Sequence, residues 1–151
     1  RFVKIAGGDN IADNLAPGTF FTLNPEKVVV ANPDIVIITS GNFQAFVPGG
    51  KWIPLGPGIN IQQSKHRLAW FTTRPAYVDS NARRRGAFFA IWHQFYNSPY
   101  DVIAIQQLAK WIHPQLFADL DPDDTFRRLH QEFLPISYQP GYMIDLEKEG
   151  R

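Results

Sequence analysis

The chain has 151 residues, of which 44% are hydrophobic and 14% aromatic, and this indicates one domain with a buried core rather than a disordered chain. The 15 Lys and Arg side chains nearly balance the 14 Asp and Glu side chains, so the formal net charge of +1 offers no field for nucleic acid or an anionic membrane. The absence of cysteine excludes disulfides, thiolate metal sites and a cysteine nucleophile, and no apolar run approaches the roughly 20 residues of a membrane span.

The first third of the chain predicts short helical segments and one buried strand. Residues 2–6 are apolar except for Lys4 and precede two glycines, which is compatible with a helix end or a strand end, and residues 9–15 are expected to form a helical turn. An Asn-Pro-Glu start predicts a helix over residues 24–31. The run 35–39 is continuously β-branched, which is typical of a parallel strand covered on both faces. Residues 40–42 leave its carboxyl end, where ligands bind in open α/β sheets.

The middle of the chain predicts a long loop, a helix and a second strand. Residues 41–58 are rich in glycine and proline and are expected to form the loop. A helix is expected over residues 59–73, with Ile61, Leu68 and Phe71 as candidates for the core. The apolar run 87–91 predicts the second strand.

The last third of the chain predicts two helices. Ser98 and Pro99 read as the cap and first residue of a helix that ends at proline 114, and its apolar face is expected to comprise Val102, Ile105, Leu108, Ala109 and Ile112. A second helix is expected over residues 121–133, which open with a cap, a proline and an acidic first turn. The tail 134–151 is expected to be irregular.

The predicted fold class is therefore α/β, with a small, mostly parallel sheet flanked by helices. Two strands make a poor sheet. A third strand is expected either from residues 2–6 or from a segment that precedes Arg1.

The four histidines show no spacing typical of a metal site. His113 and His130 are expected at helix ends or on the surface, and His66 on the solvent face of its helix. His93 lies among aromatic residues after the second strand, and its neighbours leave both core packing and ligand contact open. No Ser-His-Asp order, nucleophile elbow or phosphate-binding glycine loop is present, so the sequence gives no positive indication of an enzyme.

Side chains suited to a binding wall follow both predicted strands. They are Asn42 and Phe43 after the first strand, and Trp92, His93 and Tyr96 after the second, with Arg84 and Arg85 expected nearby. Tyrosine and histidine can contact or ligate iron, arginine pairs with carboxylate or catecholate oxygens, and tryptophan stacks on planar ligands. Two alternatives remain at this point: the aromatic residues plug the sheet edge, and the arginine run is a solvated turn. Phe95 is assigned to the core.

A set of short segments occurs in a characteristic order. They are Gly7-Gly8-x-Asn10, Leu23-Asn24-Pro25-Glu26, Ala31-Asn32-Pro33-Asp34-Ile35-Val36-Ile37, Gly56-Pro57-Gly58, Arg74-Pro75, I-W-H-Q-F-Y-N-S-P-Y (91–100), A-K-W-I-H-P (109–114) and F-A-D-L-D-P (117–122). In this order they resemble the C-terminal lobe of class III periplasmic substrate-binding proteins, which serve ABC importers of ferric siderophores, haem and cobalamin. The later segments are most similar to the iron-complex branch of that family.

The resemblance implies a two-lobe architecture of which this chain is one part. In the family, two α/β lobes are joined by one long helix and hold the ligand between them. By this resemblance, residues 1–151 match the C-terminal lobe alone, without that lobe's first strand, and the N-terminal lobe and linking helix are expected to be absent from this chain. The resemblance implies no intrinsic cofactor and no catalytic residue.

The resemblance also suggests roles for particular residues. Glu26 matches the exposed glutamate that docks to arginines of the membrane permease, and residues 40–46 match a loop that lines the cleft. Trp92, His93 and Tyr96 match a second cleft loop, in which a tyrosine of some relatives ligates ferric iron, and Tyr96 is the best candidate for that ligand. Arg84 and Arg85 would be contacts for an anion.

The leading hypothesis is thus the substrate-binding component of an ABC importer, on the periplasmic or extracellular face of the cytoplasmic membrane. It would bind a ferric siderophore or similar iron complex and deliver it to the permease subunits, meeting the membrane only through the permease or a lipid anchor. The alternatives are a haem or cobalamin receptor of the same family, an α/β enzyme with His93 as acid or base, and a lobe whose aromatic residues are merely buried. Exposure of Trp92 and Tyr96 would separate the last alternative from the leading hypothesis.

Overall fold

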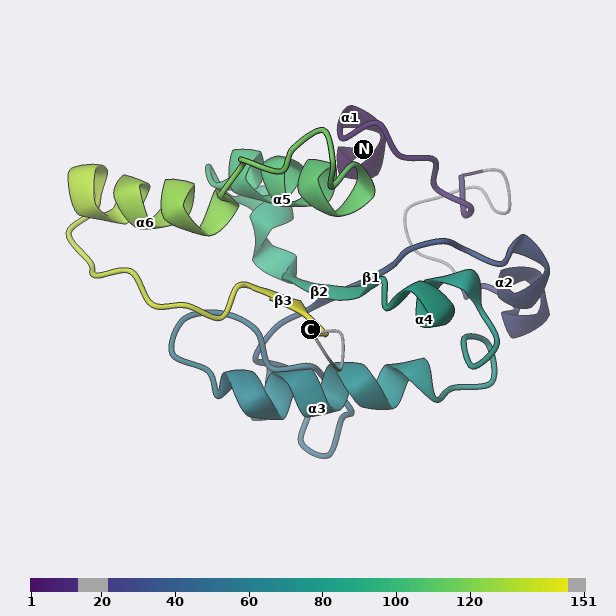
Figure 1. The fold of residues 1–151 in the computed structure, drawn as a ribbon. Coiled ribbons are helices and arrows are strands. Elements are labelled where there is room, and N and C mark those ends of the chain that lie inside the picture. Colours follow the sequence, from purple (N-terminus) through teal and green to yellow (C-terminus); the bar gives the residue numbers. More distant parts are fainter. Residues whose placement is uncertain (14–21, 147–151) are drawn as a thin grey trace.

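The computed structural model describes residues 1–13 and 22–146, which form a three-stranded sheet with helices on both faces (Figure 1). The strands are β1 (Val36–Ser40), β2 (Phe88–Trp92) and β3 (Met143–Asp145), in the order β1-β2-β3. β1 and β2 are parallel, whereas β3 is antiparallel to β2. The α/β class with a small sheet flanked by helices is confirmed, and the sheet is mixed.

The helices form two layers around the sheet. They are α1 (Phe2–Ile5), α2 (Pro25–Ala31), the 3₁₀ turn η1 (Phe43–Ala45), α3 (Ile61–Thr72), α4 (Asn81–Arg85), the 3₁₀ turn η2 (His93–Asn97), α5 (Asp101–Ile112) and α6 (Pro122–Phe133). α3 covers one face of the sheet, and α5 with α1 and α6 lies over the other (Figure 1). No helix within the described ranges is long and apolar enough to cross a membrane.

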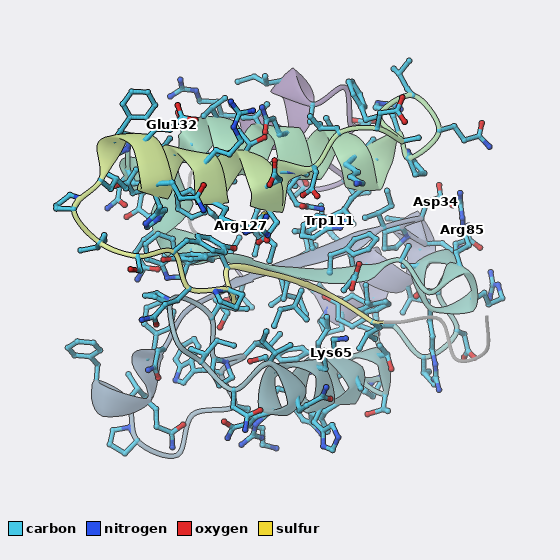
Figure 2. All side chains as sticks on the ribbon, turned by 60° about the vertical axis from the view of Figure 1, so that its left-hand side comes forward. Asp34, Lys65, Arg85, Trp111, Arg127 and Glu132 are labelled. Carbon is cyan, nitrogen blue, oxygen red and sulfur yellow. The ribbon has the colours of Figure 1, made fainter. Side chains whose placement is uncertain are left out.

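The core occupies both faces of the sheet, as the continuous apolar runs predicted. Leu68 of α3, fully buried, packs with Phe88 and Val36 on one face. Trp111 reaches from α5 to the other face, where its ring stacks on Phe89 at a centroid distance of 4.5 Å (Figure 2). Strands covered on both faces must be apolar at successive positions, which explains why their hydrophobicity is continuous rather than alternating.

The helix starts predicted from caps are confirmed at two positions. The Asn24 carboxamide oxygen accepts the backbone N–H of Glu26 at 2.9 Å, and the Asp121 carboxylate accepts that of Asp124 at 2.9 Å. In both helices proline follows the cap, where its missing N–H is not needed. The helix expected over residues 59–73 is α3, which begins after the cap Asn60.

The predicted start and apolar face of the α5 helix were partly wrong. The Ser98 hydroxyl accepts the N–H of Tyr100 at 3.3 Å, so it closes a turn before the helix, which begins at Asp101. Val102 was assigned to the packed face but is 47% exposed. Leu108 and Ala109 of the predicted face are buried, and Ile103 and Ala104, which were not assigned to it, are buried as well.

Of the two sources predicted for a third strand, residues 2–6 are wrong, and a segment preceding Arg1 stays a prediction. Residues 2–5 are helical, and the turn after them has Gly7 at φ 78°, a backbone conformation that favours glycine. The third strand comes from the tail that was expected to be irregular, where Met143 pairs with Ile91 and Ile144 with Ala90. A helical turn was expected over residues 9–15. Residues 11–13 form a turn, and residues 14 and 15 lie outside the described residues.

Candidate functional site

The carboxyl ends of β1 and β2 lie side by side and anchor the two loops of the site. Ser40, the last residue of β1, is opposite Trp92, the last residue of β2. Ser40 is 2% exposed, and its hydroxyl accepts the backbone N–H of Ile53 at 3.2 Å. This bond ties the far end of the loop to the strand from which it departs. The first part of the glycine- and proline-rich segment is therefore a closed loop over residues 41–52, held at both ends.

Four aromatic side chains from these loops form a row that we call the ring wall: Phe43, Trp52, His93 and Tyr96. The Phe43 ring meets Trp52 edge-on at a centroid distance of 5.2 Å and His93 at 6.2 Å. His93 lies 4.8 Å from Tyr96. Trp52 is 38% exposed and Tyr96 is 61% exposed, so the row is packed within itself and open to solvent on its outer side.

Sequence reasoning found three of the four residues of the ring wall. Phe43, His93 and Tyr96 were predicted site residues, and the structure brings them together. Asn42, also predicted, is exposed at the start of η1. Trp52 was missed, although a tryptophan inside a loop rich in glycine and proline was itself a signal, because such loops rarely have a core of their own to bury it in.

Trp92 was expected on the wall but packs inward. Its indole is half-buried and makes edge contacts with Phe95 at 5.4 Å and Tyr142 at 5.2 Å. The nitrogen of the same indole lies 3.1 Å from the position that a Cβ on Gly56 would occupy, so glycine is needed for this close approach. Phe95, assigned to the core from the sequence, is 2% exposed, which confirms that assignment.

The expectation that Arg84 and Arg85 lie near the aromatic residues was wrong. Both belong to α4, which leads into the amino end of β2, so the length of a five-residue strand, about 13 Å, separates them from the carboxyl margin. Arg85 pairs with Asp34 at 3.0 Å (both side chains are labelled in Figure 2), and Arg84 donates to the Asp79 carbonyl and the Asn81 side chain. The arginine run thus stabilises the end of a short helix and a neighbouring turn.

A long groove runs along the outer edge of β1 and ends at the ring wall. Its volume is about 1,090 Å³, and its lining extends from Asp34 and Arg85 at one end to His93 and Tyr96 at the other. Within the described residues no strand pairs with this edge of β1. Most of the side chains between the two ends are apolar, among them Phe2, Val3, Val28, Ile37, Leu108 and Ile112.

The remaining histidines lie outside the site. His66 is exposed on α3, as predicted, and His113 ends α5 with its Nε2 3.3 Å from the Gly7 carbonyl oxygen. His130 was expected at a helix end or on the surface; it lies in the last turn of α6 but is only 4% exposed, with its ring against Phe126 and Tyr138. No group of three or more metal-ligating side chains occurs within the described ranges.

A polar cluster lies on the far side of α6. The Tyr138 phenol donates to the Asp123 carboxylate, and Arg127 pairs with Asp123 at 2.8 Å. Burial raises the pKa of the Tyr138 phenol well above its usual range, and the hydrogen bond to Asp123 raises it further. These groups join α6 to the segment that leads to β3, and none of them belongs to the ring wall.

Comparisons with known proteins agree with this architecture. No family model matches the sequence, and no curated protein matches it. The crystal structure of the TroA-like periplasmic binding protein FepB from Veillonella parvula matches with a TM-score of 0.88 and 28% sequence identity. The match covers 97% of this chain and 41% of that chain, so the fold described above corresponds to part of that protein.

Proposed function

We propose that this chain, which fits one lobe of a TroA-like, class III periplasmic binding protein, belongs to the substrate-binding component of an ABC importer. In this proposal it binds a ferric siderophore or a similar iron complex on the periplasmic or extracellular side of the membrane and delivers it to the permease. The observation that supports the proposal most is the exposed ring wall at the carboxyl margin of two parallel strands, where open α/β sheets bind ligands.

The ring wall supplies one side of a binding site. Its contact area is aromatic, and the exposed phenol of Tyr96 could reach the iron or a chelating oxygen directly. A second surface opposite the wall is needed to enclose a ligand of that size. The chain spans 41% of the length of the matching binding protein, which is consistent with a second lobe elsewhere in the polypeptide.

The groove beside β1 supports the same two-lobe proposal. An unpaired strand edge flanked by apolar side chains is the usual setting for another strand. Arg1 lines this groove, so a segment preceding Arg1 could enter it without a long connection. We expect that segment to pair with β1 and complete the sheet of the lobe.

Glu26 is the proposed contact with the permease. It is exposed in the first turn of α2, where its carboxylate also complements the positive end of the helix. α2 lies at the opposite end of the molecule from α6 (Figure 1). A carboxylate presented this way suits an arginine on a partner protein.

Replacing this carboxylate by a cation tests the proposed function. Glu26→Arg should reduce uptake of the iron complex by cells about tenfold or more, because like charges opposed across an interface repel strongly. The affinity for the complex itself should not change. The matched control is Glu132→Arg on α6, also an exposed glutamate, which should leave uptake unchanged. Normal uptake with Glu26→Arg would refute the docking role.

A further inference from the structure

Lys51 is the only Asp, Glu, Lys or Arg residue in the two loops that carry the ring wall, which comprise residues 41–52 and 92–100. Their polar side chains near the wall are amides, such as the exposed Asn42 and Asn97. The wall therefore offers ring faces and uncharged hydrogen-bonding groups to a ligand.

Lys51 and the cations nearest to these loops in sequence have contacts outside the ring wall. Lys51 precedes Trp52, but its ammonium lies 4.6 Å from the centre of the Trp70 ring on α3. Arg74 lies over the same ring at 5.4 Å. Arg85 is paired with Asp34 at the amino margin of the sheet. Among the described residues, no Lys or Arg side chain lies over the rings of Phe43, Trp52 or Tyr96.

This composition discriminates between iron complexes of different charge. A ferric ion bound by three hydroxamate monoanions has no net charge, whereas one bound by three catecholate dianions is a trianion. When uncharged rings cover a trianion, the trianion loses its hydration and gains no compensating cation. In addition, the faces of aromatic rings carry a negative electrostatic potential, which repels an anion. A neutral complex loses little hydration and gains apolar contact.

We propose that the ring wall selects iron complexes without net negative charge, of the ferric trihydroxamate class, against ferric tris-catecholates. This inference rests on the proposed function, since it specifies the ligand of the same site. It replaces the anion contacts expected from Arg84 and Arg85, which lie at the other margin of the sheet.

The test is a pair of titrations with the intact polypeptide that carries this chain. Ferrichrome is the neutral ferric trihydroxamate and ferric enterobactin the ferric tris-catecholate, and quenching of tryptophan fluorescence reports binding because Trp52 is partly exposed. We expect ferrichrome to bind at least about tenfold more tightly than ferric enterobactin, because the wall has no cation to pair with the charge of the trianion. Asn42→Arg should strengthen binding of ferric enterobactin by about tenfold and should give ferrichrome no such gain, because the added cation does not attract a neutral complex. Gln131→Arg on α6 is the control and should change neither.

The outcomes distinguish failure of the charge selection from failure of the proposed receptor function. Equal or tighter binding of ferric enterobactin by the unaltered protein would overturn the charge selection and leave the receptor function standing. An unchanged affinity of Asn42→Arg for ferric enterobactin would also overturn the charge selection, because a cation added at the wall should attract a trianion. If neither iron complex binds, the proposed function itself fails.

Discussion

The Phe126→Ala variant is expected to lose about 3–5 kcal/mol of its free energy of unfolding, the range for removing a buried aromatic side chain. Phe126 is 1% exposed and connects α6 to the rest of the fold. Its ring lies 5.7 Å from Phe95 beneath the site and 4.9 Å from Tyr142, next to β3. Removing the ring leaves a cavity among aromatic neighbours that are too large to move into it.

Urea unfolding followed by circular dichroism measures this loss. Phe133→Ala on the same helix is the control, because Phe133 is 76% exposed and its removal should change stability by no more than about 0.5 kcal/mol. If Phe126→Ala does not fold, Phe126→Leu should fold with a smaller loss. A loss for Phe126→Ala no larger than that of the control would contradict the packing described.

Removing two rings of the ring wall should have the largest effect on binding. Each of Trp52→Ala and Tyr96→Ala is expected to weaken the affinity for ferrichrome by about tenfold or more, as for aromatic anchors in other interfaces, and the double variant by about 100-fold. Both side chains are partly exposed, at 38% and 61%, so stability should fall far less than with Phe126→Ala. The affinity is measured by isothermal titration calorimetry, since the first variant removes a fluorescent reporter.

Leu116→Ala is the control for these two variants. Leu116 is 75% exposed and follows α5, outside both loops of the wall, so its removal should leave the affinity unchanged. Undiminished binding by the double variant would show that the ligand does not rest on these rings.

Local signals account for the parts of the fold that were predicted correctly. Asn24 and Asp121 cap their helices through bonds to backbone groups only two or three residues away. β1 and β2 are apolar on both faces, and this composition does not depend on knowing which helix covers which face. The resemblance to binding proteins, judged from ordered segments, is confirmed by the structural match.

The errors arise where distant segments decide the outcome. β3 has only three residues, and its pairing with β2 depends on the path of the whole tail, so no local pattern marks it. Trp92 is the last residue of β2, and its side chain is covered by Tyr142, which the tail brings in beside it. Tyr96 lies one turn further along the chain, in η2, where Tyr142 does not cover it.

The arginine run shows the same limitation. Arg84 and Arg85 are less than ten residues from His93 in sequence, yet β2 lies between them and carries the chain from one margin of the sheet to the other. Trp52 shows the converse, because the bond between Ser40 and Ile53 returns its loop to the strand end and so sets its ring against Phe43. Proximity in sequence was misleading in both cases.

Hydrogen exchange measured by mass spectrometry on the intact polypeptide tests the central claim most directly. With ferrichrome bound, peptides that cover residues 41–52 and 92–97 should exchange more slowly, because both loops of the ring wall would be covered and ordered. Peptides from α6, residues 122–133, should not change. Protection confined to α6 or other regions away from these loops, with bound ligand demonstrated, would contradict the assignment of the ring wall as the binding surface.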